Sequence, residues 1–118
     1  MPLLKNLLKR GAQVNAKDRL KYGQTPLMLA SKHGHLEILN ELIDHGADID
    51  DTNIDGYSAI IIATENGHTK IVEQLIKKGA DLNASTKDGN TALIWAAQKG
   101  LTSLVKGLSY SFYTVCLI

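Results

Sequence analysis

Acidic and amide side chains alternate over residues 51–56, in the order Asp-Thr-Asn-Ile-Asp-Gly. This order matches the opening D-x-[DN]-x-[DN]-G of a helix–loop–helix calcium site, in which alternate side chains supply oxygen ligands. The twelfth position of such a loop should be a glutamate that gives two oxygens, but here it is Ile62. Ser58 also begins a predicted helix inside the loop. We therefore predict no calcium site and interpret 51–56 as a tight turn, in which Asp, Asn and Gly hydrogen-bond the backbone or adopt positive φ.

The other side chains that could do chemistry are scattered. His33, His35, His45 and His68 lack the cysteine or carboxylate spacing of a zinc site. Cys116 has no histidine near it in sequence to activate it as a nucleophile. The glycines recur as turn residues and do not form a phosphate-binding loop. These observations predict a protein that is not an enzyme, binds no metal and needs no cofactor.

The composition is that of an ordinary globular domain, with 118 residues of which 44% are hydrophobic and 21% charged. The 13 basic and 12 acidic residues leave a net charge of +1, so neither nucleic acid nor a membrane is expected as a partner. Any partner must then be selected by shape and local chemistry. The single cysteine, the lack of a signal-peptide pattern at 1–11 and the short uncharged tail at 107–118 favour a cytoplasmic protein.

The chain repeats itself with a period of 33 residues, which separates Gly34, Gly67 and Gly100. A repeat of this length is a supersecondary unit that must stack on its neighbours to bury its apolar face. In each unit an N-cap residue precedes a short apolar helix, a glycine ends that helix, and a second helix with one apolar stripe follows. A polar segment then forms a hairpin-like finger. The predicted first helices are 26–33, 59–66 and 92–99, after Thr25, Ser58 and Thr91, and the second helices are 36–45 and 69–78.

These segments resemble the ankyrin repeat, whose pattern runs G-x-T-P-L-H-x-A-A-x-x-G-H-x-E-I-V-x-x-L-L-x-x-G-A-D-x-N. The matching segments are GQTPLMLASKHGHLEILNELIDHGADID, GYSAIIIATENGHTKIVEQLIKKGADLNA, GNTALIWAAQKG and, as a half repeat, PLLKNLLKRGAQVNAKD. The resemblance implies an all-α fold, an ankyrin-repeat solenoid of paired antiparallel helices with projecting β-hairpin or loop fingers. It predicts a single domain over 1–118. The predicted units are an N-terminal half repeat at 2–17, a repeat with a two-residue finger insertion at 18–52, a repeat at 53–85 and a degenerate C-terminal repeat at 86–118.

The chain departs from the family pattern in several places. The histidine that usually follows Pro-Leu is replaced by Met28, Ile61 and Ile94, which predicts that its hydrogen bonds are lost. In the last unit, Gly107 and Ser109 weaken the second helix that would follow 92–99. The resemblance assigns His35 and His68 to turns between repeats. His33 and His45 are expected to be exposed, and Trp95 is expected to pack in the core.

By this resemblance, protein partners bind the finger tips and the exposed sides of the first helices, which line the concave face. The predicted finger-tip residues are Lys21, Tyr22, Gln24, Ile54, Asp55, Tyr57, Lys87, Asp88 and Asn90, and the helix residues are Lys32, His33, Glu65, Asn66, Gln98 and Lys99. Tyr22 and Tyr57 are the main candidates, because tyrosine offers a large contact area at a low cost in rotamer entropy. The structural alternatives are that Tyr22 packs against the extra residues of its own longer finger and that Tyr57 covers Thr or Ser at the next repeat.

The predicted function is a non-enzymatic module that binds a protein partner. The alternative is a fragment or structural segment of a longer ankyrin array, with no binding function of its own. That alternative is motivated by the half repeat at the start and the apolar tail, which lack a polar capping face, and it predicts self-association end to end. Two complete repeats with incomplete ends also predict a marginal fold whose ends fray first.

Overall fold

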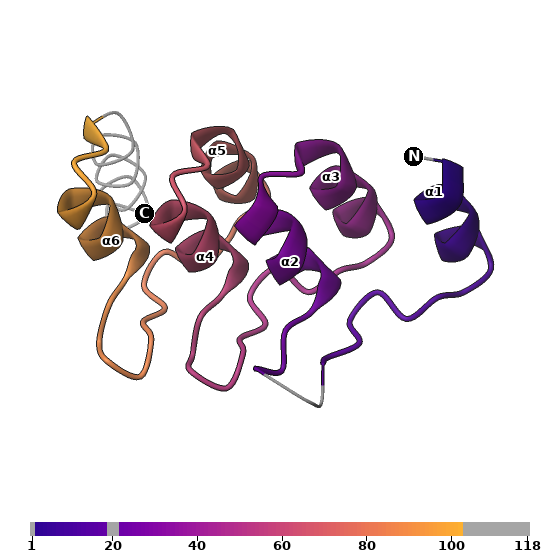
Figure 1. Ribbon diagram of the computed structural model, residues 1–118, viewed down its shortest axis with the longest axis horizontal. Helices are drawn as coiled ribbons and strands as arrows, with labels where there is room; N and C mark the ends of the chain where they lie inside the picture. Colours follow the sequence, from indigo (N-terminus) through magenta and orange to yellow (C-terminus); the bar gives the residue numbers. More distant parts are fainter. Residues whose placement is uncertain (1, 19–21, 103–118) are drawn as a thin grey trace.

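Six helices form two stacked rows in the part of the chain that the structure describes, residues 2–18 and 22–102 of a computed structural model (Figure 1). The first helices of the repeats, α2, α4 and α6, form one row, and α3 and α5 form the other, with α1 beyond α3 (Figure 1). The fold is therefore the all-α repeat that the sequence predicts. The helices are α1 (Pro2–Lys9), α2 (Pro26–His33), α3 (Leu36–Asp44), α4 (Ala59–Glu65), α5 (Thr69–Lys77) and α6 (Ala92–Gln98).

Two of the three first helices begin with the expected side-chain cap. The Thr25 hydroxyl accepts a hydrogen bond from the Met28 N–H at 3.3 Å, and the Thr91 hydroxyl accepts one from the Ile94 N–H at 3.3 Å. The prediction was wrong for Ser58 in one respect. Its hydroxyl is buried and makes no capping hydrogen bond, nor any other with a described residue.

Met28, which stands in place of the family histidine, accepts a hydrogen bond of its own. The Thr25 N–H donates to Met28 Sδ at 3.5 Å. The unbranched thioether is long enough to reach back to the start of its own helix, and its sulfur is a weak acceptor. Met28 therefore takes a side-chain hydrogen bond at a position where Ile61 and Ile94 have no polar atom to offer.

The turn after α2 is joined to the next repeat by a close contact. Gly34 ends α2 with a φ of +76°, and a Cβ on Gly34 would lie 2.8 Å from the His68 ring. The Nε2 atom of that ring is 2.9 Å from the Lys32 carbonyl oxygen. His68 thus links two repeats, as the resemblance predicts. His35 instead lies beside His33, with 6.2 Å between the ring centroids, and His33 and His45 are exposed as expected.

The core is centred on α4, which packs against α2, α5 and α6. Ile61 of α4 is fully buried, with 0% of its surface exposed, and Met28 is buried at the same repeat position of α2. Ile94, at that position of α6, is 39% exposed. Burial therefore declines from the central repeat toward the end of the described chain. Among the described helices, none is long and apolar enough to cross a membrane.

The fingers project from one side of the stack as loops (Figure 1). An isolated antiparallel bridge pairs Thr52 with Ser58, and the described residues form no strand. Main-chain hydrogen bonds join neighbouring fingers, from the Ile54 N–H to the Tyr22 carbonyl at 2.9 Å and from the Lys87 N–H to the Asp55 carbonyl at 3.0 Å. The predicted insertion in the first finger includes residues 19–21, which lie outside the described residues, as does the tail from 103 to 118 with Gly107 and Cys116.

Candidate functional site

The segment that resembles a calcium loop is the turn of the second finger. Asn53 Oδ1 accepts hydrogen bonds from the Asp55 and Tyr57 N–H groups, both at 3.0 Å, and Gly56 takes a φ of +82°. Asp51, at the first position of the calcium pattern, forms an ion pair with Lys17 at 2.9 Å. The Asn53 oxygen and the Asp51 carboxylate thus have protein partners. No three His, Cys, Asp or Glu side chains group as metal ligands among residues 2–18 and 22–102.

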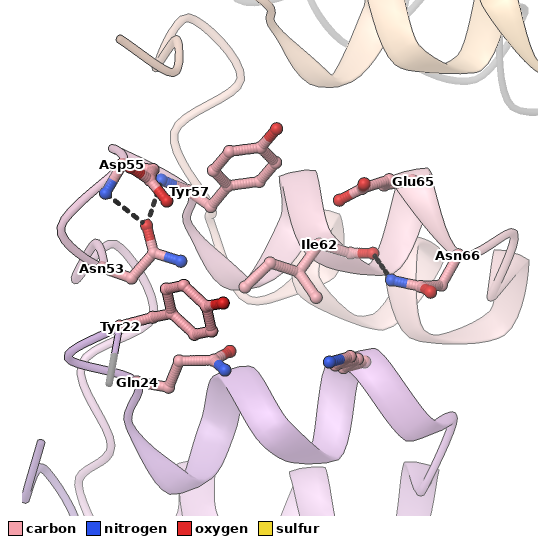
Figure 2. A pocket seen from close by; sticks show the side chains of 9 residues that line it. Tyr22, Gln24, Asn53, Asp55, Tyr57, Ile62, Glu65 and Asn66 are labelled. Atoms are coloured by element: carbon pink, nitrogen blue, oxygen red, sulfur yellow. Dashed lines mark hydrogen bonds between the residues drawn. The ribbon is translucent and has the colours of Figure 1, made fainter. Parts of the chain in front are cut away.

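A cleft of about 300 Å³ lies between the first two fingers and the helices that follow them (Figure 2). It is on the concave face, by which we mean the finger tips and the exposed sides of α2, α4 and α6. The predicted binding residues that line the cleft are Tyr22, Gln24, Lys32, Asp55, Tyr57, Glu65 and Asn66, and the cleft is completed by Asn53 and Ile62.

Tyr22 and Tyr57 lie on the finger side of this cleft, and Ile62 of α4 lies between them and the helix-borne polar groups (Figure 2). Because the Ile54 N–H binds the Tyr22 carbonyl, the two fingers that carry the tyrosines are held side by side. Tyr22 is 53% exposed, whereas Tyr57 is half-buried and packs against the hydrophobic core. The cleft therefore combines aromatic and aliphatic surface with polar groups, which is the usual composition of a recognition site.

Negative charge surrounds the Tyr57 phenol. Its pKa is raised above the ordinary value of 10.0, first by burial and then by the carboxylates of Glu65, Asp88 and Asp55. These carboxylates come from three places, namely α4, the third finger and the second finger. None of them forms an ion pair with any residue in the described ranges. They are thus free to interact with a ligand.

Trp95 extends the aromatic surface beyond the cleft into the third repeat. Its ring centroid is 6.4 Å from that of Tyr57, and Lys99 Nζ lies over the indole ring, 6.0 Å from its centroid. Trp95 is half-buried against the core, as expected. The indole Nε1 is buried without a hydrogen-bond partner among the described residues.

The remaining predicted residues do not line the cleft. Ile54 lies in a separate hollow beside Gly23, and His33 is exposed at the end of α2. The third repeat carries the others, namely Lys87, Asp88 and Asn90 on its finger and Gln98 and Lys99 at the end of α6. Lys21 is outside the described residues. Of the predicted binding residues that the structure describes, some line the cleft together and the others lie apart from it.

Asn53 and Ile62 line the cleft but were not among the predicted binding residues. Asn53 was interpreted as a turn residue only, although such a residue can both shape a finger and face a ligand. Ile62 is buried, with 4% of its surface exposed, and still lines the cleft. A signal for Ile62 was present in the repeat register, because Leu29, Ile62 and Trp95 occupy equivalent positions on the three first helices.

A family model described as Ankyrin repeats (3 copies) matches residues 1–86 and again residues 50–115. The chain belongs to the ankyrin repeat family. It is also 49% identical, over 43 residues, to ankyrin repeat domain-containing protein 49 of Bos taurus. That match covers 36% of this chain and 17% of the relative, so the chain spans a small part of that protein's length. Ankyrin repeats are generally protein–protein interaction modules and generally not enzymes.

Proposed function

We propose that this chain is a non-enzymatic module that binds a protein partner through the concave face, with the cleft between the first two fingers as its centre. The observation that carries the proposal is the convergence of Tyr22 and Tyr57 with Ile62 and polar side chains around one hollow. Tyrosine is enriched among the residues that dominate binding energy, and clefts of this kind bury an anchoring side chain of the partner. The single cysteine fits a reducing compartment, so the proposed partner is an intracellular protein.

Four side chains at the finger tips, those of Tyr22, Ile54, Asp55 and Lys87, are available for this role because the hydrogen bonds made there between fingers use main-chain atoms. A side-chain link between the first two fingers is made by Lys17, which pairs with Asp51 away from the tips. Each of the four tip side chains therefore remains free to contact a partner. In many folds the scaffold stays the same while the side chains of the binding site differ, and these side chains determine what is recognised.

The proposal is tested by capturing partners with the purified chain and measuring their affinity for variants. We expect Tyr22→Ala and Tyr57→Ala each to weaken binding about tenfold, because a residue central to an interface contributes more than about 1 kcal/mol. The matched control is Glu73→Ala with Lys77→Ala, two exposed positions of α5 that do not line the cleft. Unfolding curves show that each variant is folded. Unchanged affinity in both tyrosine variants would contradict the proposal.

A second candidate is favoured by the apolar surface at the first end of the stack. Leu3 and Leu7 of α1 and Leu29 of α2 are exposed, with Leu3 at 71%. Such side chains would be covered if the chain were a segment of a longer array or associated end to end. Light scattering over a range of concentrations tests this candidate. A mass that rises with concentration, and that falls to the monomer value in Leu3→Lys with Leu7→Lys, would support end-to-end association, whereas a constant monomer mass would exclude it.

A further inference from the structure

We infer that the cleft between the first two fingers receives the guanidinium group of an arginine on the protein partner. This inference rests on the proposed function and specifies the chemistry of the anchoring side chain. Three features of the cleft support it: its aromatic walls, its unpaired carboxylates and its surplus of hydrogen-bond acceptors.

The walls fit a flat cation with an aliphatic stem. Tyr22 and Tyr57 supply aromatic surface and Ile62 supplies an aliphatic contact. A guanidinium group is planar and weakly hydrated, so it stacks on aromatic rings more readily than an ammonium group does. The methylene stem of arginine can at the same time cover apolar surface. Lysine shares the charge but not the planar shape.

The charge of the lining favours a cation. Asp55 and Glu65 line the cleft, and Asp88 lies close enough to act on the Tyr57 phenol. No described residue forms an ion pair with any of these three. Lys32 is the one cation among the described residues of the lining and would repel the inferred ligand. The described lining nevertheless has two acidic residues, Asp55 and Glu65, against this one base. An arginine would pair with carboxylates that have no partner within the described protein.

The amide groups add acceptors. The Asn66 Nδ2 group donates to the Ile62 carbonyl at 2.8 Å, which leaves Asn66 Oδ1 available to accept. Gln24 contributes a further side-chain carbonyl to the lining. A guanidinium group offers five N–H donors in a fixed plane and no acceptor, so it matches a site of carboxylates and amide oxygens. An anionic ligand would be repelled by the Asp55 and Glu65 carboxylates of the lining.

The test is a titration of the ¹⁵N-labelled chain with N-acetyl-arginine amide, followed by NMR. We expect saturable shifts of the backbone amides at 22–24, 53–57 and 65–66, with a dissociation constant on the order of 1 mM or weaker for so small a probe. N-acetyl-citrulline amide, which has nearly the same shape without the charge, should cause no saturable shift. Absence of saturation with the arginine probe, or equal binding of the citrulline probe, would overturn the inference.

Variants test the charges separately. Asp55→Asn and Glu65→Gln should each weaken binding of the arginine probe about threefold, as expected for a partly exposed charge pair. Lys32→Gln should strengthen it, because a repulsive cation is removed. Glu37→Gln is the matched control, since Glu37 is exposed on α3 and does not line the cleft. Equal affinity in Glu65→Gln, Asp55→Asn and Glu37→Gln would contradict the inference.

The two proposals fail in different ways. If the tyrosine variants leave partner binding unchanged, the concave face is not the binding surface and the proposed function is wrong. If the tyrosine variants lose the partner while Glu65→Gln retains it and the arginine probe does not bind, the proposed function stands and only the arginine anchor is wrong.

Discussion

At the scale of single residues, the contact of Gly34 with His68 gives the clearest energetic prediction. Gly34→Ala places a side chain at positive φ and a Cβ 2.8 Å from the His68 ring, so the ring must move away from the Lys32 carbonyl. We expect a loss of about 2 kcal/mol in the free energy of unfolding, of which about 1 kcal/mol is the strained φ and the rest the lost hydrogen bond.

The matched control is Gly67→Ala. Gly67 has a φ of +75°, nearly that of Gly34, but a Cβ there would meet nothing within 4 Å. Gly67→Ala should therefore lower the free energy of unfolding by only the roughly 1 kcal/mol that is due to the strained φ. Urea unfolding of both variants measures the difference, and equal losses would mean that the His68 contact contributes nothing to stability.

Tyr57 gives a prediction of pH dependence. Because burial and three carboxylates raise the pKa of its phenol above 10.0, the folded state favours the neutral form more than the unfolded state does. The stability due to this effect is complete below pH 10 and declines as the pH rises through the raised pKa. The free energy of unfolding should therefore fall more steeply above pH 10 in the parent chain than in Tyr57→Phe.

The same group can be followed directly by ¹³C NMR of the tyrosine ring carbons. Glu65→Gln should lower the pKa of Tyr57 but leave it above 10.0, because burial is the larger cause. A Tyr57 pKa at or below 10.0 in the parent chain would contradict the described surroundings of this phenol.

At the scale of elements, the same repeat position of the three first helices, occupied by Met28, Ile61 and Ile94, differs in burial. Ile61 is fully buried in α4, whereas Ile94 is 39% exposed at the same position of α6. Ile61→Ala should lower the free energy of unfolding by about 2–5 kcal/mol, as for other buried isoleucines, and Ile94→Ala by about 1 kcal/mol or less. Chemical denaturation of the two variants compares the same change at the same repeat position. Equal losses would show that the two positions are equally packed.

The elements were predictable because each repeat carries its own boundaries. Thr25 with Pro26 begins α2 and Gly34 ends it, and both signals act within a few residues of sequence. The behaviour of Ser58 was not predictable in the same way. Its position matches that of Thr25 and Thr91, yet its hydroxyl makes no capping bond, and the direction of a small side chain depends on packing that a repeat pattern does not encode.

The cleft was predictable only in part, because its residues come from two repeats. The family resemblance placed Tyr22 and Tyr57 on fingers and Glu65 on a helix side, and these do converge. Sequence reasoning could not tell that Ile54 lies in another hollow, since adjacent residues of a tight turn point to opposite sides. Ile62 was missed for a related reason, because a residue can be mostly buried and still form the wall of a cleft.

At the scale of the whole molecule, stability should be greatest in the centre of the stack. The helix α4 packs against helices on both sides. In contrast, among the described side chains of α1, Leu8 alone is buried, so α1 contributes little to the core. Native-state hydrogen exchange should therefore show the slowest exchange in α4 and α5 and faster exchange in α1. Protection of α1 equal to that of α4 would contradict this order. For residues 102–118, exchange faster than in 58–76 remains a prediction from the sequence.

The main-chain hydrogen bonds between fingers have a consequence for how such a protein changes over generations. Because the Ile54 and Lys87 N–H groups bond to carbonyls of Tyr22 and Asp55, mutations that replace these side chains leave the joining atoms in place. Under the proposed function, single substitutions at these positions change the surface offered to a partner without removing the hydrogen bonds that join the fingers. Duplicated descendants of one ancestral gene could diverge in what they recognise while keeping the same architecture.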